Sequence, residues 1–394
     1  LIKIAMKKTA LMTTGIAGII LLIGFKINYS QPATGWHPVV QKINVEHKPF
    51  SVEVADLNGD KIKDIVIANG EDSSVTILTG MGKGIFSEAK GSTFLAGYTP
   101  NDIAIADFNK DGRPDLAFAN HDRKYLTVLK GDGQGKFSPV PGSPFAVAVR
   151  PHTHGVAVAD FNNDGNLDLL TDSWGDNHLA ILFGNNTHGF STVVKYLQVG
   201  KHPYQRARVG DLNKDGNTDI ITTNLDGNNT TILLGDGKGN FNETAGSPFA
   251  CGDSPFGVAV GDINRDGNLD LAVVNSPTIT SSNTGRDGLT ILLGDGKGGF
   301  KLMSGSPFAT GKSPSRVAIG DLNGDGLADI AVANYNSDNI SVFIMNAHGV
   351  AAAYTLQTGK YPDGIAIADL DGDGKGDIVV SNSGEYFINI VFSR

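Results

Sequence analysis

Short apolar runs and loops rich in Asp, Asn and Gly alternate along most of the chain. Residues 155–159 enter such a loop and residues 168–171 leave it, and a third apolar run follows, as at residues 231–234. A less apolar run then begins at a Phe such as Phe241. Runs of this length between turn residues are typical of β-strands. Because no segment after residue 35 has a clear period of 3.6 residues, the pattern predicts an all-β protein.

The Asp-rich loop of this unit occurs seven times. The Asp-rich segments begin at Asp56, Asp107, Asp160, Asp211, Asp262, Asp321 and Asp369. Successive starts lie 51, 53, 51, 51, 59 and 48 residues apart. Spacings of this size are typical of propeller blades with four strands. The sequence therefore predicts a seven-bladed β-propeller over residues 36–394.

Ring closure follows from the strand count. The last copy supplies three predicted strands, whereas residues 39–45 precede the first copy and belong to no blade of their own. Pairing the two removes the exposed sheet edges of an open array. We expect residues 39–45 to form the outer strand of the last blade.

The loops follow the pattern Asp-x-Asn-x-Asp-Gly-x-x-Asp, which predicts calcium binding. Oxygen donors at positions 1, 3, 5 and 9, with a backbone carbonyl near position 7, match the six to eight oxygens that Ca²⁺ prefers. An EF-hand differs, since its acidic residue stands at position 12 between two helices. Turns held by Asp and Asn without metal are the other alternative. The predicted ligands are Asp56, Asn58, Asp60, Asp64, Asp107, Asn109, Asp111, Asp115, Asp160, Asn162, Asp164, Asp168, Asp211, Asn213, Asp215, Asp219, Asp262, Asn264, Asp266, Asp270, Asp321, Asn323, Asp325, Asp329, Asp369, Asp371, Asp373 and Asp377.

The first loop departs from this pattern. Lys61 stands where the other loops have the position-6 glycine. It brings a cation and a Cβ atom to a bend that favours glycine. We expect about one Ca²⁺ per blade, with weak or absent binding in the first loop.

Composition narrows the function. The 394 residues carry a formal net charge of −9, which argues against nucleic-acid binding. Cys251 is the only cysteine and cannot form an internal disulfide, so bound metal is the expected means of making the loops rigid. We expect Cys251 itself to be a buried core thiol.

The N-terminal segment is typical of export. Two lysines after Met6 precede an apolar run over residues 10–25, and a polar stretch follows. This run lies between a signal-peptide core and a membrane span in length, so a cleaved signal peptide and a retained membrane anchor both stay open. We expect residues 1–35 to be a signal peptide or anchor plus linker, and the protein to be secreted or anchored at the cell surface.

At its loops the sequence resembles the FG-GAP and VCBS-type repeat family, which includes the propeller head of integrin α-subunits. The resemblance covers roughly residues 38–394 and implies that the Asp and Asn residues given above bind calcium. There are departures from the family pattern. Phe-Gly occurs in the matching place at Phe256, while a Gly-Ser-Pro-Phe variant begins at Gly142, Gly246 and Gly305.

The rim opposite the Asp-rich loops is the expected binding surface. In a propeller it carries the loops between strands 2 and 3 and the segments between blades. In the segments between blades Lys and Arg outnumber Asp, and we expect Arg316, Asp102 and Asp363 to contribute to the charge of this rim. The candidate ligand-binding residues of blades 3 and 4 are His152, His154, Trp174, His202, Tyr204 and Arg206. Aromatic rings beside imidazole and guanidinium groups suit a sugar ring or a carboxylate.

Two functions follow from this surface. The first is a monomeric recognition or adhesion module that binds a protein or a carbohydrate. The second is a carbohydrate-active enzyme such as a polysaccharide lyase, with His or Tyr as base and Arg neutralising a uronate. No motif assigns a catalytic residue.

The residue three places before each loop is mostly alanine. Close packing around a central channel favours small residues there. Glu53 and Arg208 are the exceptions. Their relation to the channel stays open at the level of sequence.

Overall fold

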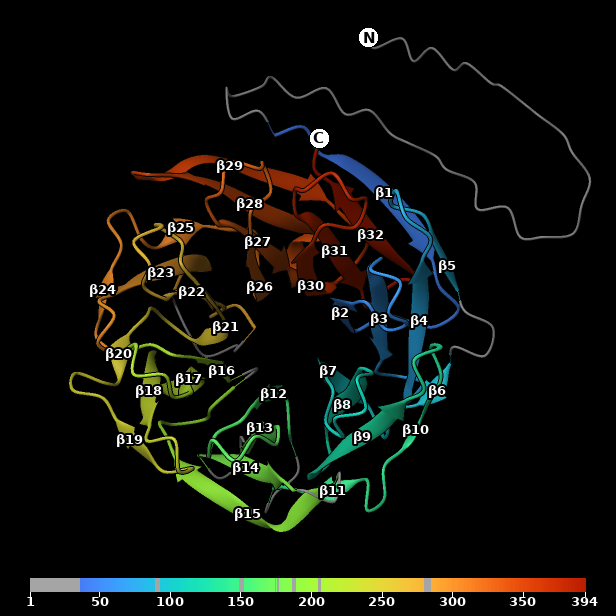
Figure 1. The fold of residues 1–394 in the computed structure, drawn as a ribbon. Coiled ribbons are helices and arrows are strands. Elements are labelled where there is room, and N and C mark those ends of the chain that lie inside the picture. Colours follow the sequence, from blue (N-terminus) through green and yellow to red (C-terminus); the bar gives the residue numbers. More distant parts are fainter. Residues whose placement is uncertain are drawn as a thin grey trace, which may run out of the picture.

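The computed structural model describes residues 36–88, 93–148, 152–173, 175, 177–185, 189–204, 207–279 and 285–394. Seven antiparallel sheets surround a central axis like the blades of a fan (Figure 1). Each sheet has four main strands. In six sheets these strands are ordered as they follow one another in the chain, and in the seventh the first strand of the chain pairs with the last. The predicted all-β, seven-bladed propeller is confirmed.

Within each blade the strands are given in order from the axis to the outer edge. Blade 1 has β2 (Ser51–Ala55), β3 (Asp64–Asn69), β4 (Ser74–Gly80) and β5 (Phe86–Glu88); blade 2 has β7 (Pro100–Ala106), β8 (Asp115–Asn120), β9 (Tyr125–Gly131) and β10 (Phe137–Pro139); blade 3 has β12 (Val156–Ala159), β13 (Asp168–Ser173), β14 (His178–Gly184) and β15 (Phe190–Gln198). Blade 4 has β16 (Arg208–Gly210), β17 (Asp219–Asn224), β18 (Asn229–Gly235) and β19 (Phe241–Glu243); blade 5 has β21 (Pro255–Gly261), β22 (Asp270–Asn275), β23 (Gly288–Gly294) and β24 (Phe300–Leu302). Blade 6 has β26 (Pro314–Gly320), β27 (Asp329–Asn334), β28 (Asn339–Asn346) and β29 (Gly349–Gln357); blade 7 has β30 (Pro362–Ala368), β31 (Asp377–Asn382), β32 (Phe387–Phe392) and β1 (Val39–Asn44).

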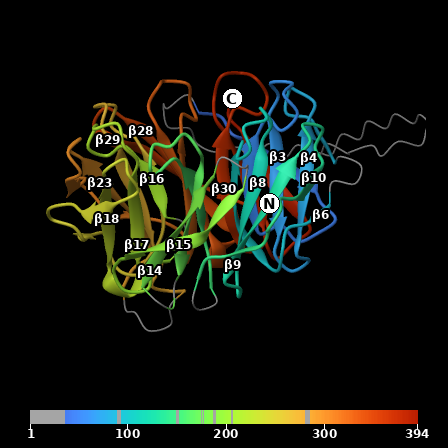
Figure 2. The same cartoon turned by 60° about the horizontal axis from the view of Figure 1, so that its bottom comes forward.

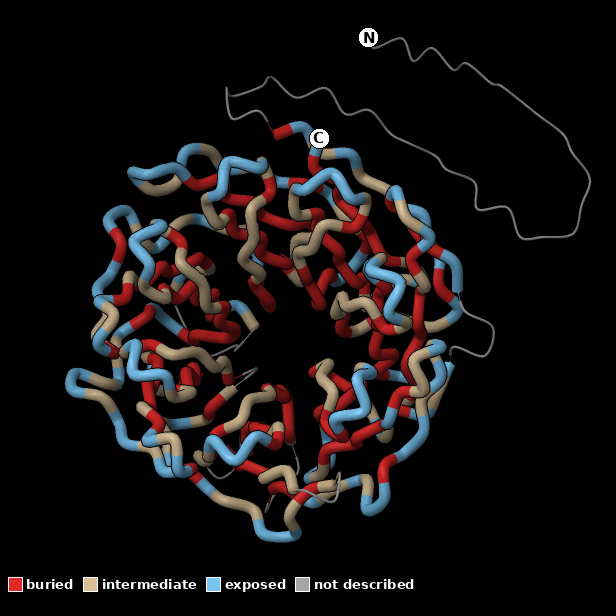
Figure 3. Tube along the Cα trace, in the orientation of Figure 1, coloured by how far each residue is buried: buried red, intermediate tan, exposed pale blue. Residues whose placement is uncertain are grey.

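The hydrophobic core is a ring of blade junctions. Seven clusters of buried side chains each join two neighbouring blades, and one of them closes the ring between blades 7 and 1. Every residue of the second strand in every blade is buried, because both faces of that strand pack against a neighbouring blade. Figure 3 shows the buried residues inside and the exposed ones around the edge. Cys251 is buried in one of these clusters, as expected.

The Gly-Ser-Pro-Phe variant protects the outer edge of three blades. In blade 4 the outer strand β19 pairs with only one end of β18. Ser247 Oγ accepts a hydrogen bond from Ile232 N at 3.0 Å, and the short strand β20 (Phe249–Ala250) pairs with the other end of β18. The strands β11 (Phe145–Ala146) and β25 (Phe308–Ala309) repeat this arrangement, and β6 (Phe94–Leu95) occupies the same place in blade 1.

The N-terminal strand closes the ring. β1 pairs antiparallel with β32, from Val39 opposite Phe392 to Asn44 opposite Phe387. Trp36 is buried, and its Nε1 donates a hydrogen bond to Ser393 Oγ at 2.9 Å. The predicted closure of the last blade by the first strand is confirmed.

Helix is scarce and short. The named helical elements in the described ranges are two 3-10 turns, η2 (Leu225–Gly227) and η3 (Tyr335–Ser337). The described residues contain no helix that is long and apolar enough to cross a membrane. The predicted signal peptide or anchor, residues 1–35, lies outside the described residues.

The antiparallel order places the loops on two rims. The loops between strands 1 and 2 lie at one end of the strands, and we call this end the Asp rim. The loops between strands 2 and 3 share the other end with the segments between blades, and we call this end the opposite rim. Figure 2 shows the strands running between these two ends.

Candidate functional site

The Asp-rich loops fold around their own acidic side chains. In blade 2, Asp107 Oδ2 accepts a hydrogen bond from Gly112 N at 2.7 Å. Asn109 Oδ1 accepts one from Asp111 N at 2.9 Å, and Asp111 Oδ1 accepts one from Arg113 N at 3.0 Å. The side chains at positions 1, 3 and 5 are thereby turned into the loop. The other loops repeat most of these bonds.

The aspartate at position 9 has a structural role of its own. In blade 4, Asp219 is fully buried, with Oδ2 accepting a hydrogen bond from Leu212 N and Oδ1 accepting one from Gly235 N, both at 2.8 Å. It therefore ties the loop to the end of the third strand. A Cβ at Gly235 would collide with the carbonyl oxygen of Thr218, which explains the glycine there. The equivalent pair of bonds is made by Asp64, Asp115, Asp168, Asp270, Asp329 and Asp377.

Burial disfavours the charged form of the position-9 carboxyl groups. Desolvation raises the pKa of Asp168 and Asp329 to about 7 and that of Asp219 to about 6, although backbone hydrogen bonds lower it. The neighbouring aspartates of the same loop raise it further. A cation beside such a loop would relieve this repulsion.

The oxygen donors fit a calcium ion in the loop that has acids at positions 1, 3 and 5. Carboxylate oxygens of Asp369, Asp371 and Asp373 all lie within 4.8 Å of one another. Oxygens bound to a single Ca²⁺ at ~2.3–2.6 Å cannot be more than about 5 Å apart, so this spacing is compatible with a shared ion. Each carboxylate oxygen has a second lone pair beyond the one used by a backbone N–H. One cation already meets this set, since Arg394 Nη1 lies 3.0 Å from Asp371 Oδ2.

The first loop keeps the common backbone despite its lysine. Lys61 has φ 69°, close to the 80° of Gly112 at the same position of the next loop. Lys61 N donates to Asp56 Oδ2 at 2.8 Å, as the glycine does elsewhere. The substitution therefore strains the bend without changing the path of the chain.

On the opposite rim the structure brings together three of the six candidate residues. His154 is buried, and its Nδ1 lies 2.8 Å from Asp172 Oδ2. The ring of Tyr204 lies 4.3 Å from that of His154, centroid to centroid, and the ring of His152 stacks with that of His154 at 5.8 Å. His202 belongs to a separate pair with Asp226, at 2.6 Å.

Trp174 and Arg206 lie outside the described residues. His121, Asp122 and Asp172 contact His152 or His154 and were not predicted from the sequence. His121 and Asp122 directly follow β8, in the loop between strands 2 and 3 of blade 2. The adjacent His121 and Asp122 in that loop are the sequence signal that could have identified this part of the cluster.

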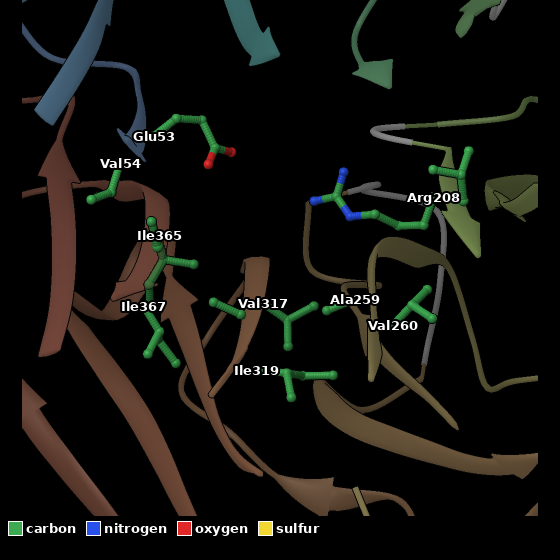
Figure 4. A pocket seen from close by; sticks show the side chains of 12 residues that line it. Glu53, Val54, Arg208, Ala259, Val260, Val317, Ile319, Ile365 and Ile367 are labelled. Carbon is green, nitrogen blue, oxygen red and sulfur yellow. The ribbon is translucent and has the colours of Figure 1, made fainter. Parts of the chain in front are cut away.

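The axial channel is lined by the residues three places before each loop. Glu53, Arg208, Ala259, Ala318 and Ala366 line one part of it, and Figure 4 shows the Glu53 and Arg208 side chains directed into this space. These two exceptions to the alanine pattern are therefore channel residues.

A buried charged network lies at the end of the channel nearer the opposite rim. Arg316 Nη1 lies 3.2 Å from Asp102 Oδ1, and its Nε lies 3.3 Å from Asp363 Oδ1. Arg316 comes from blade 6 and Asp102 from blade 2, so the guanidinium reaches across the axis between blades that are not neighbours. The expectation that these three residues contribute charge to the rim surface is wrong, because all three are buried and paired.

A pocket rich in aromatic side chains opens over blades 6, 7, 1 and 2 of the opposite rim. Tyr335 and Tyr361 stack there at 5.0 Å between centroids, with 23° between the ring planes. Tyr98 lines the same pocket, and Lys48 and Glu71 form an ion pair of 3.1 Å at its wall. These five residues come from five different segments between blades or between strands, so their meeting was not predicted from the sequence.

Comparison with known families settles the membership of the chain. A family model described as FG-GAP-like repeat matches residues 56–118, 107–171, 211–273, 279–332 and 321–380, which is more than half of the sequence. The chain belongs to the FG-GAP-like repeat family. The matches fall on the loops and strands of the propeller blades, so the resemblance seen in the sequence is confirmed.

A relative by sequence and several solved structures are similar to this chain. Cartilage acidic protein 1 of Xenopus tropicalis is 24% identical over 180 residues, a match that covers 43% of this chain and 28% of that protein. The periplasmic gluconolactonase PpgL of Pseudomonas aeruginosa superimposes with a TM-score of 0.60 at 17% identity, covering 87% of this chain and 96% of the enzyme.

Two further structures resemble this one. The Agrocybe aegerita lectin that recognises non-reducing terminal N-acetylglucosamine has a TM-score of 0.53 at 19% identity, covering 88% of this chain and 86% of the lectin. BBS1N, solved in complex with ARL6DN, has a TM-score of 0.58 at 15% identity, covering 89% of this chain and 93% of its own. At such low identities these likenesses show the fold alone.

Proposed function

We propose that this FG-GAP-type propeller is an exported calcium-binding recognition module that binds its ligand on the opposite rim. The observation that carries the calcium part is the repetition of one loop in all seven blades, with its acidic side chains turned inward. Calcium would be held by the side-chain oxygens at positions 1, 3 and 5, next to the aspartate at position 9, and would make the Asp rim rigid. Extracellular modules of this kind bind calcium at ~10⁻⁴–10⁻³ M, which suits a place outside the cytoplasm.

A carbohydrate is the ligand class that the pocket on the opposite rim favours. Stacked tyrosines with a neighbouring ion pair offer flat apolar surfaces and polar groups to a sugar ring. The propeller-shaped lectin supports this choice as an analogy of fold, and BBS1N with its protein partner supports the wider class of recognition modules. Export is supported by the charge and apolar pattern of residues 1–35 and by a relative named for cartilage.

The lyase alternative has less support from the geometry of blades 3 and 4. Burial raises the pKa of Tyr204, with Asp172 as the next cause, so its phenolate form is disfavoured at neutral pH. A general base should titrate near the working pH. Release of an unsaturated product from a uronate polymer would nevertheless establish the enzyme over the binding module.

Calcium dependence is tested by thermal unfolding. A ligand that binds only the folded state at ten times its Kd stabilises that state by about 1.4 kcal/mol per site. Removing calcium with a chelator should lower the melting temperature by several degrees, and added Ca²⁺, unlike Mg²⁺, should restore it. Identical melting curves with and without chelator would contradict the proposal that the protein binds calcium.

Ligand binding is tested on a glycan array with calcium present. Tyr335→Ala and Tyr361→Ala should each abolish the signal of the bound glycan, because they remove the stacked pair. Tyr386→Ala is the matched control, since Tyr386 is 56% exposed and does not line the pocket. A signal that survives both pocket variants, or no glycan signal alongside specific protein capture, would overturn the carbohydrate assignment.

A further inference from the structure

Three histidines converge on the opposite rim where blades 2 and 3 meet. His121 follows β8, and His152 and His154 lie in the segment that leads into β12. One nitrogen of each ring lies within 4.8 Å of a nitrogen of each of the others. The centroid of the His121 ring lies 5.2 Å from that of His152 and 4.9 Å from that of His154. The angles between the ring planes are 80° and 66°. His121 is thus in edge-to-face contact with both of the other rings.

Each of the three rings has a carboxylate close to its Nδ1 atom. Asp172 Oδ2 lies 2.8 Å from His154 Nδ1, and both groups are almost fully buried. Asp122 Oδ1 lies 3.2 Å from His121 Nδ1 and 3.5 Å from His152 Nδ1. A carboxylate that accepts a hydrogen bond from Nδ1 fixes the tautomer, leaves Nε2 as the metal-binding nitrogen and increases its basicity. Metal-bound histidines usually have such a partner.

The surroundings of His121 favour its neutral form. Burial lowers the pKa of His121, and the nearby His154 lowers it further, against the opposing effect of Asp122. Neutral rings are the form that binds metal. His121 and His152 side chains keep 31% and 39% of their surface exposed, so an ion can reach the cluster from solvent.

We propose that His121, His152 and His154 form a site for a divalent transition metal of the zinc class. Imidazole nitrogens favour Zn²⁺, Co²⁺, Ni²⁺ and Cu²⁺ over Ca²⁺, which takes oxygen ligands, so this site is chemically separate from the Asp-rich loops. Three protein ligands are the number found in zinc sites that keep a position open for water or another ligand. The metal would therefore present a coordination position on the rim where recognition is proposed.

The test is cobalt binding to the full chain without a histidine tag, at a fixed calcium concentration. One equivalent of Co²⁺ should produce a visible absorption band that Zn²⁺ removes by competition. His121→Ala and His152→Ala should each abolish the band. Asp122→Asn removes a supporting carboxylate and should weaken Co²⁺ binding by about tenfold or more.

His47→Ala is the matched control. His47 lies on the same rim and also pairs with an aspartate, Asp72 at 3.0 Å, but within the described ranges it belongs to no metal-ligating group. This variant should bind Co²⁺ like the unchanged protein. A calcium-dependent melting temperature that is the same in all variants would show that they are folded.

Absence of the band in the unchanged protein, or an unaltered band in His121→Ala and His152→Ala, would overturn the proposal. The calcium assignment would be unaffected by that result, because its readout is the melting temperature with and without chelator. Should His121→Ala not fold, the half-exposed His152→Ala and the Asp122→Asn affinity still decide the matter.

Discussion

Single residues fix the shape of each Asp-rich loop, and Lys61 is the clearest case. The bend at position 6 requires a left-handed backbone, which glycine adopts freely and other residues adopt at a cost of roughly 1–2 kcal/mol. Six loops have glycine there, and Lys61 takes the same conformation at φ 69°. At position 6 the first loop therefore contains strain that the other six avoid, whereas loops 2 to 5 have a left-handed non-glycine residue at position 4 instead.

Lys61→Gly should stabilise the protein. Relief of the left-handed strain exceeds the extra chain entropy of glycine, about 0.5–1 kcal/mol, so a net gain of up to about 1 kcal/mol is expected. The measurement is the urea midpoint in the presence of chelator, which separates the backbone effect from metal binding. Gly112→Ala in the second loop is the mirror control and should destabilise by a similar amount. A lower midpoint for Lys61→Gly would contradict the strain argument.

At the scale of the element, each loop and its blade are joined by the position-9 aspartate. Both oxygens of Asp219 accept backbone hydrogen bonds, one from the loop and one from the end of β18. The four predicted ligands of a loop therefore divide into three that face the loop interior and one that also fastens the third strand.

Asp219→Asn and Asp215→Asn should differ in their dependence on calcium. Asparagine at position 219 places an NH₂ group against a buried backbone N–H, which should cost about 1–3 kcal/mol of unfolding free energy with or without calcium. Asp215 is exposed at position 5, so its replacement should have little effect in chelator and should reduce only the stabilisation that calcium adds. Urea unfolding of both variants, with calcium and with chelator, makes this comparison. Equal losses for the two variants in chelator would refute the division of roles.

The sequence predicted the elements better than it predicted the contacts between distant elements. Strand order, the positions of the Asp-rich loops and ring closure follow from a repeat near 50 residues and from a strand count, because each blade repeats the same local pattern. The pairing of Arg316 with Asp102 was missed, since it joins blades that are far apart in sequence and meet only at the axis. The histidine cluster was found only in part, because His121 belongs to a different class of loop from His152 and His154.

At the scale of the whole molecule, stability depends on closing the ring. Each hydrophobic cluster joins two blades, so an open ring would expose one junction and one sheet edge. β1 supplies the outer edge of blade 7, and Trp36 packs edge to face on Tyr354 of blade 6 at 5.0 Å. The first strand and Trp36 before it therefore hold the last two blades together.

Deleting residues 1–45 should open or unfold the ring. The loss uncovers the full length of β32 and removes Ile43 and Val45 from the cluster between blades 7 and 1. We expect a melting temperature lower by many degrees, or association of chains through the exposed strand. Deletion of residues 1–35 is the control and should leave melting unchanged, because β1 and Trp36 remain. Thermal unfolding and light scattering on both truncated chains measure the two effects. If the longer deletion melts like the shorter one and stays monomeric, β1 does not hold the ring closed.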